Sequence, residues 1–395
     1  MKEVYIVSVA RTPIGNLGGV LSTVPAIDLG KTAISAAVER AGIEAKEVGE
    51  VFMGCVLTAN TGQAPAKQAA LAAGIPNTAP CTTINKVCSS GMKAMMLGAS
   101  AIMLGSQDVV VAGGMENMSM APHYLPTGRT GLRYGNGQVV DAIVKDGLQD
   151  PYNGDMMGSC GEVCAEGKDI NKEQQDAYAF ASYERARAAY KNGWFDAEIV
   201  PVSVPQRRKD PILVSQDEEV NNGRITDIAS VQKGRAVFKK GGTVTAINAS
   251  KINDGAAAVV MMSKEKMESL GLKPIAKITG FADAAQEPLW FTTAPALAMP
   301  KAAALAGKKV QDFDLYEINE AFSVVALANM KELDLAHDKV NVMGGAVAMG
   351  HPIGVSGCRI MITLLSALKN KGGKTGLAGI CNGGGGASAM AVELV

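Results

Sequence analysis

The chain has 395 residues, of which 47% are hydrophobic and 19% are charged, so its composition excludes a disordered protein. Lysine plus arginine (38) balances aspartate plus glutamate (38), and this net charge of zero argues against bulk electrostatic binding to nucleic acid or to an anionic membrane. No apolar run reaches the roughly 18 residues of a membrane span, and the first residues do not form a signal peptide, so we expect a cytoplasmic protein.

In chain order, short apolar runs alternate with alanine-rich helical patterns. The pattern predicts a strand over Val4–Val9, a helix over Ala26–Ala41, a strand over Val51–Val56, helices over Lys67–Ala73 and Met92–Leu104, and a strand over Val109–Ala112. This alternation of strands and helices is typical of an α/β protein with a mostly parallel sheet that is covered on both faces.

Part of this pattern recurs about 266 residues later. Gly91 and Gly113 flank one helix and the following strand, and Gly357 and Gly379, also 22 residues apart, flank another. We interpret the repeat as two duplicated halves, although small-residue patterns can coincide in a chain rich in glycine and alanine. The predicted domains are an N-terminal half (1–120 plus 251–271), an inserted loop domain (121–250, with a helix over Gln174–Lys191) and a C-terminal half (272–395).

The seven cysteines are an odd number, and no two form a Cys-x-x-Cys pair. A secreted disulfide framework and a zinc site are therefore not expected. No metal and no cofactor is predicted.

Cys88 is the first candidate for chemistry, within the sequence Asn-Lys-Val-Cys-Ser-Ser-Gly that precedes an apolar helix. The positive end of the helix dipole favours a thiolate, which is the nucleophilic form of cysteine. The alternative is a small buried cysteine in a turn that begins a helix.

His351 is the second candidate, since it lies between Gly350 and Pro352 in a tight loop before the second-copy helix. Histidine is the usual proton carrier near neutral pH. The other two histidines have different settings: His123 suggests a structural role, and His337 lies in a polar stretch that predicts a surface position.

Cys381 begins a third candidate, Cys-Asn-Gly-Gly-Gly-Gly, which follows a predicted strand. No Lys-Ser/Thr pair follows, so a phosphate loop is disfavoured, whereas the glycine N–H groups suit an oxyanion hole. A tight turn between strands is the alternative. Asn319 is a fourth candidate at the end of another strand, although capping a helix is the commoner role of such an asparagine.

These four candidates lie in loops at strand ends, where α/β sheets carry ligand sites. A thiol nucleophile, a histidine base, a second thiol and glycine-rich donors together indicate acyl transfer through a thioester.

The same residues resemble the thiolase family over nearly the whole chain, and the biosynthetic, acetoacetyl-CoA-forming branch (acetyl-CoA C-acetyltransferase) most closely. The motifs that carry the resemblance are NKVCSSG at 85–91, GGMENMS at 113–119, GTVTAINAS at 242–250, NEAF at 319–322, GHPIGVSG at 350–357 and CNGGGG at 381–386. The resemblance implies two βαβαβαββ halves in a five-layered αβαβα arrangement, with an inserted loop domain that binds coenzyme A.

The resemblance also implies the catalytic roles. Cys88 would take the acetyl group, His351 would activate it, and Cys381 would remove a proton from the second acetyl-CoA. Asn319, through a water, and His351 would form one oxyanion hole, and the N–H groups of Cys88 and Gly383 would form the other.

The implied ligands are acetyl-CoA, acetoacetyl-CoA and CoA. The substrate-binding candidates are Met157, Phe238, Ala246, Ala249, Ser250, Ala321 and Phe322. The basic segment 231–242 suits the phosphates, with a solvated loop as the alternative. A homotetramer or homodimer is expected, and the stretch Thr127–Asp141 resembles the tetramerisation loop.

This chain departs from the family pattern at Met156, Ile247, Lys251 and Phe291. The bulk of Phe291 and Ile247 predicts a short acyl pocket. Two alternatives remain open: a thiolase for longer 3-ketoacyl-CoA chains, and a non-catalytic acyl-CoA-binding protein. A ketoacyl synthase is disfavoured because the NEAF motif and the Cys381 loop fit thiolases.

Overall fold

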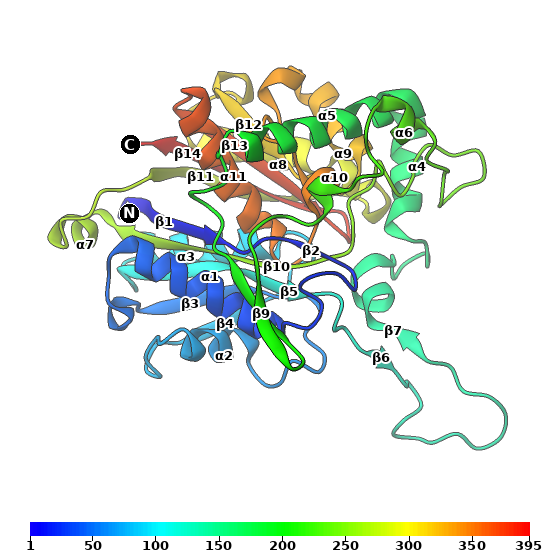
Figure 1. Ribbon diagram of the computed structural model, residues 1–395. Helices are drawn as coiled ribbons and strands as arrows, with labels where there is room; N and C mark the ends of the chain where they lie inside the picture. The colour runs from blue at the N-terminus through cyan, green and yellow to red at the C-terminus, as the bar shows by residue number, and fades with distance from the viewer.

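The computed structural model describes all residues from Met1 to Val395. A ten-stranded sheet runs through the molecule, with helices packed around it (Figure 1). In spatial order its strands are β12 (Leu315–Ile318), β13 (Thr375–Asn382), β14 (Gly386–Leu394), β11 (Ala276–Ala285), β1 (Val4–Arg11), β10 (Asn253–Ser263), β5 (Val109–Asn117), β3 (Glu50–Gly54) and β4 (Cys81–Ile84), with β2 (Gly15–Asn16) paired to β10.

The prediction of a mostly parallel sheet was wrong. Only β12–β13, β3–β4 and β3–β5 pair in parallel, whereas the five pairings across the middle of the sheet are antiparallel. The error has a physical reason, because every residue of the central antiparallel strand β10 is buried. Such a strand is apolar throughout, as parallel strands are, and its composition does not reveal its direction.

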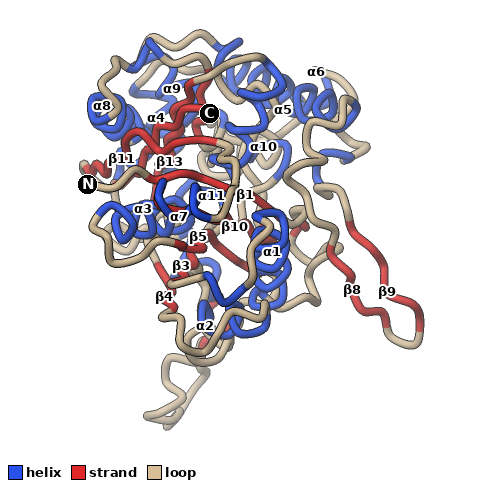
Figure 2. The backbone as a smooth tube through the Cα atoms, turned by 90° about the vertical axis from the view of Figure 1, so that its left-hand side faces the viewer, coloured by secondary structure: helices blue, strands red, loops and turns tan.

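The helices pack on the sheet in layers. They are α1 (Ala26–Ala41), α2 (Pro65–Ala72), α3 (Ser90–Met103), α4 (Met157–Gly167), α5 (Lys172–Lys191), α6 (Ile228–Gln232), α7 (Lys264–Ser269), α8 (Pro295–Leu305), α9 (Ser323–Leu333), α10 (Ala346–Met349) and α11 (Ser356–Lys371). Helices α3 and α11 contact each other at the centre, α1 covers the outer face of β10 and β1, and α8 covers the outer face of β11 and β14 (Figure 2). The five-layered αβαβα arrangement is therefore confirmed.

The predicted helices and strands of the first half are present, with ends that differ by a few residues. Helix α1 spans the predicted Ala26–Ala41 and ends at Gly42, whose φ of 67° is left-handed and suits glycine. Helix α5 begins at a capping box in which Asn171 and Gln174 satisfy each other's backbone N–H groups. None of the helices combines the length and the apolar character that a membrane span requires.

The segment 121–250 contains α4 to α6 and two small hairpins. The hairpin of β8 (Val202–Gln206) and β9 (Lys209–Val214) projects from the body (Figure 2). The segment between β6 (His123–Tyr124) and β7 (Val140–Asp141) extends further still (Figure 1). The predicted domain boundaries stay predictions.

The two halves meet through glycines that bring main chains into contact. A Cβ atom at Gly114 would lie 2.1 Å from the carbonyl oxygen of Gly354, and one at Gly54 would lie 2.5 Å from the same oxygen. A Cβ atom at Gly357 would lie 2.4 Å from the backbone nitrogen of Met92. Only glycine allows such an approach, so these positions set how closely α3 and α11 pack.

Gly357→Ala tests this packing. Alanine is the better helix former by about 1 kcal/mol, so propensity alone predicts a gain in stability. We expect instead a loss of about 2 kcal/mol in the free energy of unfolding, because the methyl group would overlap backbone that cannot move freely. Denaturant unfolding of this variant beside Gly223→Ala, where a Cβ atom meets nothing within 4 Å, measures the effect. A Gly357→Ala protein as stable as the control would contradict it.

Candidate active site

Cys88 lies in the turn between β4 and α3, two residues before the helix begins. The preceding residue, Val87, has a left-handed φ of 49°, which is strained for a β-branched side chain. Hydrogen bonds hold the turn, since the Ser90 hydroxyl donates to the Val87 carbonyl (2.6 Å) and accepts from the Lys86 N–H (2.8 Å). The turn therefore places Cys88 at the N-terminal end of α3, as predicted.

The Cys88 sulfur faces two backbone donors. Burial raises the pKa of the Cys88 thiol to about 12, while the N–H groups of Gly383 and of Cys88 itself act in the opposite direction. These are the two N–H groups that the family resemblance implied for an oxyanion hole. At rest Cys88 is thus a thiol, and ionising it requires a base.

His351 lies in the loop between α10 and α11, and its ring is buried. Its backbone N–H donates to Asn253 Oδ1 (2.8 Å), and its Nδ1 lies 2.6 Å from the Ser356 hydroxyl. That hydroxyl donates its single proton to the Pro352 carbonyl at 3.1 Å. The hydroxyl must then accept from Nδ1–H, so the lone pair is on Nε2.

Nε2 of His351 is buried and has no hydrogen-bond partner in the protein. Burial, together with the positive charge of Arg359, lowers the pKa of His351 to about 3. The ring is therefore neutral at physiological pH, with an unoccupied acceptor that can take a proton from a thiol or, once protonated, donate to an oxygen.

Cys381 is the penultimate residue of β13, just before the turn to β14. A Cβ atom at Gly385 in that turn would lie 2.1 Å from the Gln286 carbonyl oxygen, and its φ is 83°, so glycine is required there. Burial and the nearby Cys88 raise the pKa of Cys381 well above its usual range. The two sulfurs therefore interact, and together they resist carrying two negative charges.

Asn319 follows β12, and its backbone N–H donates to the Gly379 carbonyl at 3.0 Å. Both polar atoms of its side chain, Oδ1 and Nδ2, are buried without a partner. A buried unpaired polar group costs about 1–3 kcal/mol, which points to a water or a ligand as the missing partner.

Glu116 is a site residue that sequence reasoning missed. This buried carboxylate accepts from the N–H groups of Val56 (3.0 Å), Leu57 (3.0 Å) and Gly354 (2.9 Å). Burial raises the pKa of Glu116 to about 7, although the three hydrogen bonds act to lower it. Because Gly354 belongs to the His351 loop, Glu116 ties that loop to the N-terminal half. The motif GGMENMS contained this residue, but nothing in its spacing indicated the role.

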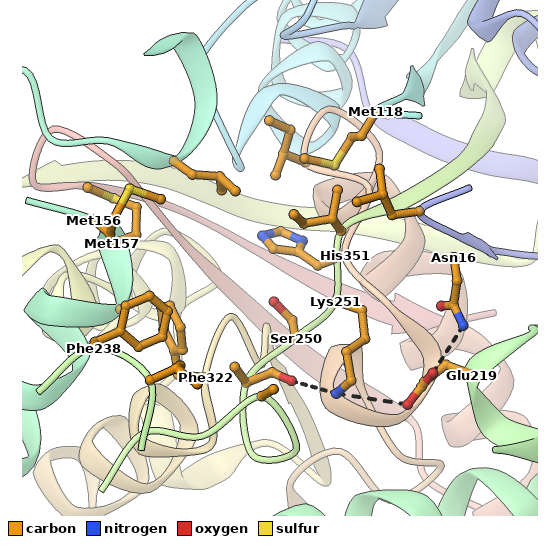
Figure 3. Close-up of a pocket in the computed structure, with 18 residues that line it drawn as sticks. Asn16, Met118, Met156, Met157, Glu219, Phe238, Ser250, Lys251, Phe322 and His351 are labelled. Atoms are coloured by element: carbon orange, nitrogen blue, oxygen red, sulfur yellow. Dashed lines mark hydrogen bonds and ion pairs between the residues drawn. The ribbon is translucent and has the colours of Figure 1, made fainter. Parts of the chain in front are cut away.

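A cavity of about 510 Å³ opens beside these loops (Figure 3). It is lined by His351 and by six of the seven predicted substrate-binding residues: Met157, Phe238, Ala246, Ala249, Ser250 and Phe322. The seventh, Ala321, does not line it, although its carbonyl accepts from the Ser250 N–H at 3.0 Å.

Cys88, Cys381 and Gly383 border the cavity without lining it, and Asn319 is not among its lining residues either. Cys381 shares an apolar cluster with the lining residues Ala249 and Phe322. Cys88 packs against the apolar cluster that contains Met118 and Ile353, both of which line the cavity. A Cβ atom at Gly383 would lie 3.5 Å from the sulfur of Met157, another lining residue. Cys88 and Gly383 therefore lie beside apolar residues of the cavity wall.

The structure shows the surroundings of two further features singled out in the sequence, His337 and the basic segment 231–242. His337 is not a simple surface residue: its ring stacks on Tyr178 with 4.9 Å between centroids, and burial lowers its pKa to about 4. In the basic segment, Lys239 pairs with Glu166 at 2.9 Å, while Lys233, Arg235 and Lys240 are exposed.

Sequence reasoning also gave no role to Lys251 and Glu219, which line the cavity. Lys251 was noted only as a departure from the family pattern. Glu219 belongs to the inserted segment 121–250, and only the folding of the chain brings it to the cavity wall. No pattern in the sequence indicates this position.

Comparison with known proteins agrees with this geometry. The family models for "Thiolase, N-terminal domain" and "Thiolase, C-terminal domain" match residues 4–265 and 272–394. "Acetyl-CoA acetyltransferase 2" of Arabidopsis thaliana is 57% identical, over 100% of this chain and 98% of its own length. "Acetyl-CoA acetyltransferase ERG10, cytosolic" of Gibberella zeae is 55% identical, over 100% of this chain and 98% of its own.

A solved structure is also closely similar. The Acat5 thiolase from Ascaris suum, crystallised in complex with coenzyme A, has a TM-score of 0.94 and 45% identity, and each chain covers 100% of the other. With matches of this extent in both halves, the chain belongs to the thiolase family.

Proposed function

We propose that this chain is an acetyl-CoA C-acetyltransferase, which condenses two acetyl-CoA molecules reversibly to acetoacetyl-CoA and CoA. The observation that carries the proposal is a neutral His351 with an unpaired Nε2 in the wall of an apolar cavity that Cys88 and Cys381 both border. The relatives named acetyl-CoA acetyltransferase over the full chain length support it.

In the first half-reaction, Nε2 of His351 accepts the Cys88 proton as the sulfur attacks the acetyl carbonyl carbon. The carbonyl oxygen becomes negative, and the N–H groups of Cys88 and Gly383 stabilise it. The bond from carbon to the CoA sulfur then breaks, and His351 returns the proton to CoA. The acetyl group is left on Cys88.

In the second half-reaction, Nε2 of His351 takes the Cys381 proton, and the resulting Cys381 thiolate removes a proton from the methyl carbon of a second acetyl-CoA. His351 and a water held by Asn319 stabilise the enolate oxygen, and the carbanion attacks the acetyl group on Cys88. Cys88 leaves as a thiolate and takes the proton held by His351, so both cysteines end as thiols and the ring is neutral again. A thiol whose pKa is raised is a stronger base once ionised, as this weakly acidic carbon requires.

Phe291 favours a short acyl chain. It is buried in the same apolar cluster as Cys381 and Phe322, where it fills space that a longer chain would need. Neither residue lines the cavity, but Phe291 shares its cluster with the lining residues Ala249 and Phe322, whereas the cluster against which Ile247 packs contains none. We therefore assign the restriction to Phe291 alone.

We also propose a cytosolic homo-oligomer. The cytosolic name of the Gibberella relative supports the location. The extended segment between β6 and β7 exposes Leu125, Leu132, Tyr134 and Val139, and apolar side chains gathered on one loop favour contact with further copies of the chain.

The function is tested by trapping the intermediate. We expect incubation with acetyl-CoA to add one acetyl group to the Cys88 peptide, detected by mass spectrometry, and Cys88→Ala to lose both the adduct and the activity in either direction. Thiolysis of acetoacetyl-CoA should be faster than that of 3-ketohexanoyl-CoA. An unmodified Cys88, or a preference for the longer chain, would overturn the proposal.

Cys381→Ala separates the two half-reactions. Acetylation of Cys88 should persist, because the first half-reaction does not need Cys381, whereas condensation should fall by at least about 100-fold through loss of the base. Mass spectrometry measures the first rate and steady-state kinetics the second. Condensation at the wild-type rate would show that another group removes the proton.

Ser356→Ala removes the acceptor that holds the His351 tautomer. We expect kcat to fall about tenfold, equivalent to ~1.4 kcal/mol, because the ring can then carry its proton on Nε2. The matched control is Ser100→Ala, whose hydroxyl bonds only to the Met96 carbonyl in its own helix. Equal kcat values for the two variants would refute the tautomer argument.

A further inference from the structure

Lys251 places a positive charge in the wall of the substrate cavity. Its side chain is 21% exposed, and it lies in the extended segment between the loop 246–250 and β10. Figure 3 shows the ammonium group pointing away from the open cavity, toward a backbone oxygen and Glu219. Such burial is costly for an ammonium group unless polar partners surround it.

The partners are backbone carbonyl oxygens. Nζ donates to the carbonyl of Ala249 at 2.8 Å, and to those of Ile247 and Val347 at 3.4 Å each. The face of the Tyr183 ring, with its centroid 5.9 Å away, adds a cation–π contact. Three carbonyl dipoles and an aromatic face make a cage that suits a small monovalent cation.

Glu219 completes the cage at 4.0 Å from Nζ. Its Oε1 already accepts from the Tyr183 hydroxyl (2.6 Å) and from Asn222 Nδ2 (2.9 Å), and its Oε2 accepts from Asn16 Nδ2 (3.0 Å). The carboxylate is therefore fixed in place by neutral donors. Burial lowers the pKa of Lys251 to about 8, while Glu219 and Glu320 act in the opposite direction.

The three carbonyls come from two segments that are far apart in the sequence, the loop 246–250 and α10. Ile247 and Ala249 belong to the loop 246–250, of which Ala246, Ala249 and Ser250 line the cavity. Val347 belongs to α10, which ends two residues before His351. One ammonium group thus joins the substrate-contacting loop to the helix that leads into the catalytic loop.

We propose that Lys251 is a positioning residue, a cation tethered to the chain that holds the loop 246–250 against α10 in the geometry that binds CoA thioesters. His351 does not depend on Lys251, since Asn253 and Ser356 hold it separately. Loss of the cation should therefore weaken ligand binding more than it slows the chemical steps.

The inference rests on the proposed function for its kinetic readout, so a binding measurement accompanies it. Lys251→Ala should raise the KM for acetoacetyl-CoA and the calorimetric Kd for CoA about tenfold, with kcat within about threefold of wild type. Ammonium chloride should restore both constants, because the free ion can occupy the vacated cage, and sodium chloride at equal ionic strength should not.

Lys301→Ala, which removes an exposed lysine on α8, is the matched control and should respond to neither salt. Lys251→Gln keeps N–H donors without the charge and serves if the alanine variant fails to fold; it too should bind CoA more weakly than wild type. Wild-type affinity for CoA in either folded Lys251 variant would overturn the proposal. So would a loss of CoA affinity that parallels a fall in melting temperature and that ammonium chloride does not reverse. An inactive wild-type enzyme that binds CoA would instead count against the proposed function alone.

Discussion

The site depends on main-chain contact between the two halves of the fold. Gly54, Gly91 and Gly114 surround the carbonyl oxygen of Gly354, at positions where any side chain would collide with it. Gly357 meets the backbone of Met92 in the same way. Since Cys88 and His351 lie a few residues before Gly91 and Gly357, this contact brings the nucleophile and the base to one place. Glu116 fastens the arrangement through its hydrogen bond to Gly354.

The same packing leaves polar groups buried without partners. Nε2 of His351 and both side-chain atoms of Asn319 lack hydrogen bonds within the protein. Other buried side-chain atoms, on residues such as Thr292 and Ser323, also lack partners. His351 differs from them because it lines the cavity, so its Nε2 marks where a substrate oxygen belongs. The rigid backbone around them keeps the site from closing on itself, so the unpaired groups are available when negative charge develops on a thioester oxygen.

Much of this could be predicted from the sequence, and the failures have physical causes. Helix α1 and the Cys88 turn followed from local patterns, because capping, periodicity and glycine conformations act over a few residues. The direction of β10 did not, since a fully buried strand has the same composition whether its neighbours are parallel or antiparallel. The contacts of Glu116 and Lys251 join residues that are far apart in the sequence, 238 positions for Gly354 with Glu116 and 96 for Lys251 with Val347. These contacts, and that of Lys251 with Glu219, exist only in the folded chain. The stacking of His337 on Tyr178 was also not predictable from the sequence, because the two residues come together only in the folded chain.

The central claim is that the groups left unpaired by this packing receive the thioester oxygen. A crystal structure of the Cys88→Ala protein with bound acetyl-CoA tests it most directly. The account predicts a thioester carbonyl oxygen next to the His351 ring and within hydrogen-bond distance of a water on Asn319, with the methyl carbon facing the Cys381 sulfur. A thioester bound elsewhere in the cavity, with the Asn319 amide paired to protein atoms, would contradict it.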